Sequence, residues 1–189
     1  FIAGAGVQWL RDRMKFFKKA PETERIIKKL KDNNGIYLVP AFTGLGAPYW
    51  NANSRGVLSG ITRDTSPEEI VRATIEAVAY QTYDLFEAMK HDGLRPRIVK
   101  VDGGMVMNNW FSQFLSDVVN VKVLRPKVQE TTAAGAAFMA GLKIGVYKSL
   151  KDISRNWQID RKFSPKMNFK KRNILIRGWS KAIKRTLIN

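Results

Sequence analysis

The stretch "KVDGGMVMNN" at residues 100–109 does most to place this chain among α/β folds, because it joins a strand to a helix through two glycines. The apolar run 98–101 predicts a short strand, and residues 108–118 predict a helix. Gly103 and Gly104 lie between the strand and the helix, and their presence there has two possible explanations. They form a tight turn, or they let a ligand approach the backbone, because glycine has no Cβ to hold it away.

Strands and helices alternate on both sides of this stretch. The best-marked helix begins at Ser66, with Pro67 at its first position and Glu69 completing a capping box. This alternation is typical of an α/β domain. We predict strands at residues 36–39, 57–61, 98–101 and 121–124, and helices at 3–17, 22–31, 66–93, 108–118 and 129–145.

The composition excludes several classes of site. The chain has 189 residues, no cysteine and one histidine, His91, so disulfides, cysteine-ligated zinc and sites built from several histidines are excluded. No apolar run reaches the roughly 18 to 20 residues of a membrane span, and a cytoplasmic location is expected. The chain begins without methionine and without a helix cap, so we interpret it as a piece of a longer protein.

The net charge of +17 is concentrated near the C-terminus, where residues 146–189 hold 13 Lys and Arg against two Asp. Such a tail suits a nucleic acid or an anionic membrane. It is also typical of a solvated helix surface. Apolar residues recur at helical spacing within it, which favours a packing helix and makes nucleic acid the weaker alternative. They are Ile174, Leu175, Ile176, Trp179, Ile183 and Leu187.

Two small-residue segments are candidate ligand contacts. Ligands of α/β sheets lie at the carboxyl ends of strands, where Gly103 and Gly104 are placed, and Asn108 follows one helical turn later. Ala134–Ala137 allow close approach of either a neighbouring helix or a flat ring. "GLGAPYW" at 44–50 lacks the Lys-Ser/Thr ending of a phosphate loop.

Acidic residues are sparse, and none is paired for acid–base catalysis. Asp64 and Asp102 lie beside strand ends or glycines, and Glu76 is expected to face a partner within its own helix. His91 lies at a helix end, where a cation is tolerated. No catalytic residue is assigned in this chain.

Taken together, these segments resemble the FGGY family of carbohydrate kinases, and in particular its glycerol kinases. The resemblance is strong over residues 1–150 and weaker over 151–189, where "RGWSKAIKR" carries it. The matching segments are "AGAGVQWLRD" (3–12), "VPAFTGLGAPYW" (39–50), "RGVLSGITRD" (55–64), "IVRATIEAVAYQT" (70–82), "VDGGMVMNN" (101–109), "FSQFLSDVVN" (111–120) and "TTAAGAAFMAGL" (131–142).

The resemblance implies a ribonuclease-H-like domain of the actin/hexokinase type, the C-terminal half of a two-domain kinase. Residues 1–150 would form the nucleotide-binding domain, and 151–189 a basic helical extension of it. By position, Gly4, Gln8, Gly104 and Asn108 match the family's nucleotide contacts, with Gly103 and Ala134–Ala137 as neighbours. The cofactors implied are ATP and Mg²⁺.

The resemblance also implies the reaction, transfer of the γ-phosphoryl group of Mg-ATP to glycerol to give glycerol 3-phosphate. The catalytic base and glycerol pocket would lie upstream, in a full enzyme expected to be a homo-oligomer, so this chain alone is predicted to be inactive. A non-catalytic remnant or split half, and a basic nucleic-acid-binding module, are the alternatives. Some bacterial members bind a regulatory protein through an acidic stretch that is basic here ("SPKMNFKKRN", 164–173), so that regulation is not expected.

Overall fold

The computed structural model describes residues 2–128 and 130–188 and confirms a mixed α/β chain. Most predicted elements are present within a few residues of their expected bounds. The elements are α1 (Gly4–Asp12), α2 (Glu22–Lys28), β1 (Tyr37–Val39), β2 (Val57–Ser59), α3 (Pro67–His91), β3 (Ile98–Lys100), the 3₁₀ helix η1 (Gly104–Met107), α4 (Asn109–Val119), β4 (Lys122–Pro126), α5 (Thr131–Lys143), α6 (Leu150–Arg155), β5 (Ile159–Phe163) and α7 (Phe169–Leu187).

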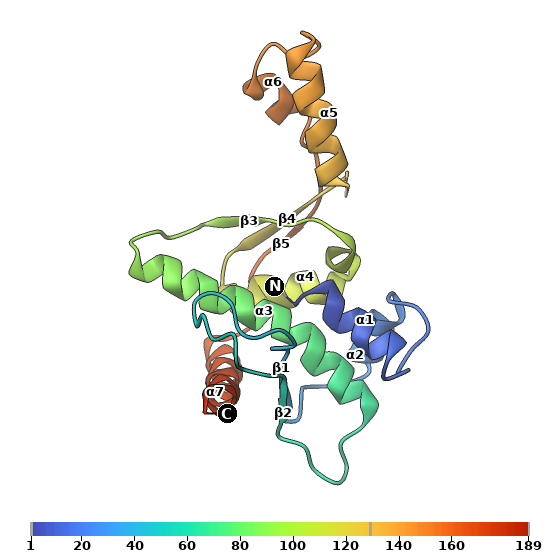
Figure 1. Cartoon of the computed structure of the whole chain (residues 1–189), viewed down its shortest axis with the longest axis vertical. Coiled ribbons are helices and arrows are strands. Elements are labelled where there is room, and N and C mark those ends of the chain that lie inside the picture. The colour runs from blue at the N-terminus through green and yellow to red at the C-terminus, as the bar shows by residue number, and fades with distance from the viewer. Residues whose placement is uncertain (1, 129, 189) are drawn as a thin grey trace.

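The strands form two groups around the long helix α3 (Figure 1). β1 and β2 pair antiparallel, whereas β4 pairs parallel with β3 and antiparallel with β5. Helix α4 contacts both α3 and β4, and α7 contacts β1 and β2. The main hydrophobic core lies where these elements meet, and α3 contributes to it along most of its length.

Helix α3 begins as the sequence predicts. The Glu69 side chain accepts a hydrogen bond from the Ser66 backbone N–H at 2.8 Å, and Pro67 occupies the first helical turn. Helices α1 and α2 are shorter than predicted, ending at Asp12 and Lys28. Among the described residues, none of the helices has the length and apolar character needed to cross a membrane.

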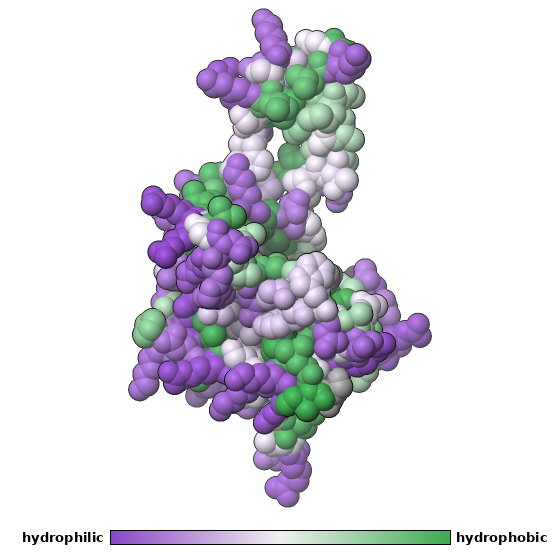
Figure 2. Space-filling model, turned by 60° about the vertical axis from the view of Figure 1, so that its left-hand side comes forward, coloured by the Kyte–Doolittle hydropathy of each residue, from purple (hydrophilic) through white to green (hydrophobic). Residues whose placement is uncertain are grey.

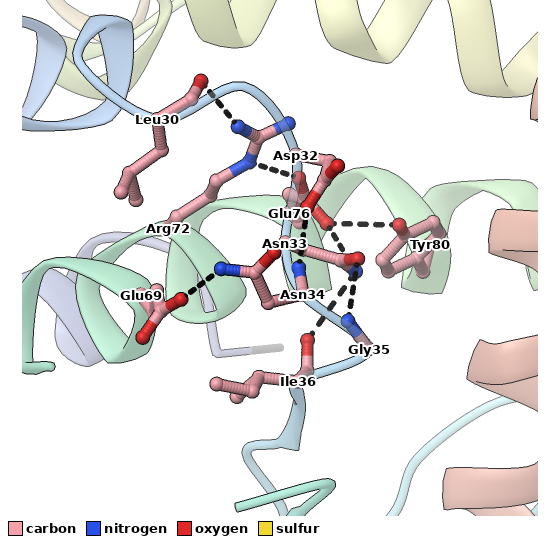
Figure 3. A network of polar contacts seen from close by, with 10 residues as sticks. All are labelled: Leu30, Asp32, Asn33, Asn34, Gly35, Ile36, Glu69, Arg72, Glu76 and Tyr80. Atoms are coloured by element: carbon pink, nitrogen blue, oxygen red, sulfur yellow. Dashed lines mark hydrogen bonds and ion pairs between the residues drawn. The ribbon is translucent and has the colours of Figure 1, made fainter. Parts of the chain in front are cut away.

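A fully buried carboxylate, Glu76, lies at the centre of α3 (Figure 3). It accepts hydrogen bonds from Arg72 Nε at 2.7 Å, the Tyr80 hydroxyl at 2.9 Å and Asn33 Nδ2 at 3.2 Å. Arg72 also donates to the Leu30 carbonyl at 2.9 Å. Burial raises the pKa of the Glu76 carboxyl, and the opposing charge of Arg72 acts against that rise. The network joins α3 to the segment between α2 and β1.

Helix α7 docks through one aromatic side chain. Trp179 is fully buried, stacks on Tyr80 at 5.2 Å between ring centroids, and donates its indole N–H to Asp84 at 2.7 Å. At Gly178 a Cβ would overlap the Tyr37 ring, so only glycine permits this approach of α7 to β1. The predicted packing face is therefore confirmed for Leu175, Trp179 and Ile183, and Ile176 is half-buried. Ile174 and Leu187 are exposed and do not belong to it.

Residues 127–128 and 130–158 form an arm that extends from the paired strands β4 and β5 (Figures 1 and 2). Its base is closed by the Lys127 N–H, which donates to the Gln158 carbonyl at 2.9 Å. Hydrophobic side chains are exposed on it, including Met139, Ile144 and Leu150. The strand β5 was not predicted, because three charged residues separate Ile159 from Phe163. The predicted domain boundary near residue 150 stays a prediction.

Replacing Glu76 with Ala should lower the free energy of unfolding by about 3–5 kcal/mol, because Arg72 would keep a buried charge without a partner. The double change Arg72→Met with Glu76→Leu should recover much of this loss. Urea unfolding followed by circular dichroism measures both. The exposed pair Lys90–Glu87 provides the control, and Glu87→Ala should cost less than about 1 kcal/mol. A Glu76→Ala loss as small as that of the control would contradict the role given to the network.

Asp84 should make stability depend on pH. Burial raises its pKa to about 6, against the opposing hydrogen bonds from Trp179 and Tyr49, whereas an unfolded Asp titrates near 3.9. Between pH 3.9 and pH 6 the Asp84 carboxyl holds a proton in the folded chain that it has lost in the unfolded chain. The free energy of unfolding therefore falls as pH rises through this range. When pH is lowered from 7 to 4.5, the free energy of unfolding of the parent chain should rise by on the order of 1–2 kcal/mol relative to that of Asp84→Asn.

The measurement is urea unfolding of both proteins across that pH range. Asp64→Asn, at an almost fully exposed carboxylate, is the matched control. Parallel pH curves for the parent chain and Asp84→Asn would show that Asp84 has no such effect.

Candidate functional site

A cavity of about 410 Å³ opens between α1, the start of α2 and η1. This size suits a small organic ligand, for which cavities of about 300–1,000 Å³ are usual. Four residues that the sequence analysis singled out line it: Gly4 and Gln8 from α1, and Gly104 and Asn108 from the segment that opens α4. The other lining residues are Val7, Arg11, Ala20, Pro21, Thr23, Glu24, Ile75, Met105 and Met107.

The two neighbouring glycines have different reasons to be glycine. Gly103 has a φ of +82°, a backbone conformation that side chains disfavour, and it makes the turn into η1. It is not among the residues that line the cavity, although it was expected beside the ligand. Gly104 does line the cavity, and a Cβ built there would meet nothing within 4 Å. Gly103 therefore serves the turn, and Gly104 leaves space in the cavity.

Asn108 is held in place from two sides. Its Oδ1 accepts a hydrogen bond from the Phe111 N–H at 2.9 Å, which caps the start of α4. Its Nδ2 donates to the Thr23 hydroxyl of α2 at 3.3 Å, and that hydroxyl donates to the Ala20 carbonyl at 2.7 Å. The amide therefore has a defined orientation at the cavity wall, with a second N–H hydrogen that these bonds do not use.

Glu24 places a carboxylate in the wall of the same cavity. The side chain is 18% exposed and accepts hydrogen bonds from Lys28 Nζ at 2.6 Å and from the Asn109 N–H at 3.1 Å. Burial raises the pKa of Glu24, but the bonds from Lys28 and Asn109 outweigh it, so that the pKa lies below its usual value. Glu24 is therefore ionised at neutral pH and can only accept hydrogen bonds.

Sequence reasoning missed Glu24. Like Glu22, it is an acid in a short polar helix, and nothing in the spacing distinguishes the two. Only the contact of α2 with the start of α4 brings Glu24 to the cavity.

The rest of the wall is largely apolar, with Val7, Ile75, Met105 and Met107 beside the polar groups. An apolar cavity with a few fixed polar groups suits a flat ring whose edge forms hydrogen bonds. Among the described residues, no side chain caps the start of α1 at Gly4, and the Gly6 N–H donates to the Ala3 carbonyl at 3.1 Å. The positive end of the helix dipole at Gly4 therefore favours an anionic group. The cavity therefore offers an apolar surface for a ring and the positive end of a helix for an anionic group.

Other candidate residues lie elsewhere. Ala134–Ala137 belong to α5 in the arm and do not line the cavity. Asp102 accepts a hydrogen bond from the Thr131 hydroxyl and so links the end of β3 to the start of α5. His91 ends α3 and is exposed. In residues 2–128 and 130–188, no three His, Cys, Asp or Glu side chains are grouped as a metal site requires.

Residues 1–144 match the model of the FGGY family of carbohydrate kinases, C-terminal domain. Glycerol kinase 1 of Pseudomonas aeruginosa is 53% identical over 185 residues, which cover 98% of this chain and 37% of that protein. The glycerol kinase of Caldanaerobacter subterraneus subsp. tengcongensis is 50% identical over 188 residues. The chain therefore spans somewhat more than a third of the length of these relatives.

Solved structures agree with the sequence matches. The crystal structure of Plasmodium falciparum glycerol kinase with ADP superposes with a TM-score of 0.86 and 37% identity, covering 98% of this chain and 37% of that one. A xylulose kinase from Lactobacillus acidophilus, at 23% identity and a TM-score of 0.76, shares the fold. The predicted fold class, a C-terminal kinase domain of the ribonuclease-H-like, actin/hexokinase type, is thereby confirmed. The chain belongs to the FGGY family of carbohydrate kinases, and residues 1–144 correspond to its C-terminal domain.

Proposed function

We propose that this chain is the ATP-binding part of a glycerol kinase, which transfers the γ-phosphoryl group of Mg-ATP to glycerol and yields glycerol 3-phosphate. One observation carries the proposal: Gly4, Gln8, Gly104 and Asn108, about 100 residues apart in the chain, line one cavity of suitable size. The similarity to proteins named glycerol kinase, one of them solved with ADP, supports it.

In this proposal, the chain binds and orients the nucleotide. Gly104 and Gly4 let the ligand approach the backbone, and the amides of Gln8 and Asn108 hydrogen-bond to it. The described residues offer no cluster of metal ligands, so Mg²⁺ enters the proposal as the counter-ion of the phosphates. Phosphoryl transfer depends largely on such positioning and on charge neutralisation.

The proposal assigns no catalytic base to this chain. Among the described residues of the cavity wall, Glu24 is the one carboxylate, and it is already bonded to Lys28 and Asn109. We place the base and the glycerol pocket in the part of the relatives that this chain does not span. The homo-oligomeric state of a full enzyme and the cytoplasmic location stay predictions.

Two alternatives differ from this proposal in what they bind. A decayed or split half would fold and bind no nucleotide. A basic nucleic-acid-binding module would bind duplex DNA with an affinity that falls steeply with salt. The buried face of α7 favours a structural role for the C-terminal helix, because Trp179 and Ile183 belong to the core.

Gly104→Val should weaken ADP binding at least about tenfold, because the added side chain would fill ligand space, while its Cβ would meet no protein atom within 4 Å. Asn108→Ala should also weaken it. Isothermal titration calorimetry on the 189-residue chain measures both, and thermal melting checks that the variants fold. Gly135→Val is the matched control, since a Cβ there is equally unhindered but lies outside the cavity. Unchanged ADP affinity in both site variants would show that the nucleotide is not bound here.

The chain by itself should produce no glycerol 3-phosphate from ATP and glycerol. The reason is that, among the described residues that line the cavity, none is a free general base that could take the proton of the glycerol hydroxyl. A coupled enzymatic assay for glycerol 3-phosphate tests this, with a full-length relative as the positive control. Product formation above background would mean that a catalytic base has been overlooked in the chain.

A further inference from the structure

We infer that Glu24 selects the base of the nucleotide: its carboxylate accepts a hydrogen bond from the 6-amino group of adenine and disfavours purines that carry a 6-oxo group. The inference rests on the proposed function, because it requires a nucleotide in the cavity that Glu24 lines. It adds a specificity-determining residue to the positions already proposed as nucleotide contacts.

The charge of Glu24 indicates which end of the ligand lies beside it. The carboxylate bonds to the backbone of Asn109, so it lies next to Asn108 at the start of α4. A carboxylate repels phosphate groups, especially in a partly desolvated wall. The start of α1 at Gly4 has the opposite character, because it is the positive end of a helix dipole. The base therefore lies at the α2 end of the cavity and the phosphates toward α1.

The polar groups at the α2 end are complementary to one edge of adenine. Glu24 accepts one bond at each carboxylate oxygen, from Lys28 at Oε1 and from Asn109 at Oε2. The Asn109 side chain also bonds to the carboxylate. Because a carboxylate has about four lone-pair positions, it can still accept a bond from a ligand donor. Asn108 uses one Nδ2 hydrogen for Thr23 and keeps the other for a ring nitrogen. Adenine presents an amino donor beside a ring-nitrogen acceptor, which matches this acceptor and donor pair.

A 6-oxo purine would place an acceptor oxygen against an acceptor carboxylate. Since Glu24 is ionised at neutral pH, it has no proton with which to satisfy that oxygen. Sites built around a buried hydrogen bond discriminate strongly against ligands that leave the bond unmade. We therefore expect the chain to bind ADP at least about tenfold more tightly than IDP, whose base has a 6-oxo group in place of the 6-amino group and a hydrogen on N1.

The test compares ADP with IDP, its hypoxanthine analogue, by isothermal titration calorimetry on the full 189-residue chain and on Glu24→Gln. Glutamine keeps the size of the side chain and adds an amide donor for the 6-oxo group. We expect the ADP/IDP preference to fall from about tenfold or more to within about threefold. Thermal melting confirms that the variant is folded.

Two control variants separate recognition from structure. Lys28→Met removes the ion pair of Glu24 but keeps the carboxylate in the cavity, so it should preserve the preference. Glu68→Gln removes one negative charge at an exposed position outside the cavity, and it should leave the preference for ADP over IDP unchanged. Loss of the preference in Lys28→Met as well as in Glu24→Gln would mean that the ion pair, and not the acceptor, is responsible, and would overturn the inference.

The remaining outcomes distinguish the inference from the proposed function. Equal affinities for ADP and IDP in the parent chain would overturn the inference and leave the nucleotide site in place. An unchanged ratio of ADP to IDP affinity in folded Glu24→Gln would also overturn the inference and leave the nucleotide site in place. If the parent chain binds neither nucleotide, the proposed function fails and the inference fails with it.

Discussion

The buried ion pair between Arg72 and Glu76 is the interaction on which the rest of the structure depends. A charge pair out of water is costly unless further hydrogen bonds satisfy both partners. Here Asn33 and Tyr80 donate further hydrogen bonds to the Glu76 carboxylate, and the Arg72 guanidinium donates one to the Leu30 carbonyl. The bond from Asn33 fixes the turn before β1 against α3. On the other side of α3, Tyr80 stacks on Trp179 and so fixes helix α7. One pair of charges in a single helix thus connects three parts of the chain.

The same helix fixes the walls of the cavity. Ile75, next to Glu76, lines it directly, and α1 lies so close to α3 that a Cβ at Gly6 would press on Thr74. The opposite wall is held separately, since Arg125 of β4 donates to the Val106 carbonyl of η1 at 2.9 Å. The cavity therefore lies between an α3-anchored pair of helices and a sheet-anchored turn. This arrangement lets groups distant in sequence keep a defined spacing, which a ligand-positioning site requires.

Local signals predicted much of this molecule from the sequence. The capping box at Ser66 located the start of α3, and strand-like runs located β1, β3 and β4, because these features depend on neighbouring residues only. The pair Gly103–Gly104 was predicted to lie where backbone and ligand meet, and the family resemblance favoured Gly104 as the contact and Gly103 as its neighbour. The φ of +82° at Gly103 assigns the turn to that residue and leaves Gly104 to the cavity. A strand with charged residues, β5, escaped prediction because pairing with β4 stabilises it, not its own hydrophobicity.

The sequence by itself determined the order of the elements up to α5, the absence of cysteine chemistry and the resemblance that pointed to a kinase family. Only the tertiary structure decided that Gly4, Gln8, Gly104 and Asn108 share one cavity, and that Glu24 joins them. The physical reason is that Glu24 reaches the cavity through a hydrogen bond to Asn109, 85 residues further along the chain. Contacts between residues so far apart in sequence depend on how the helices pack, and local residue patterns do not predict that packing.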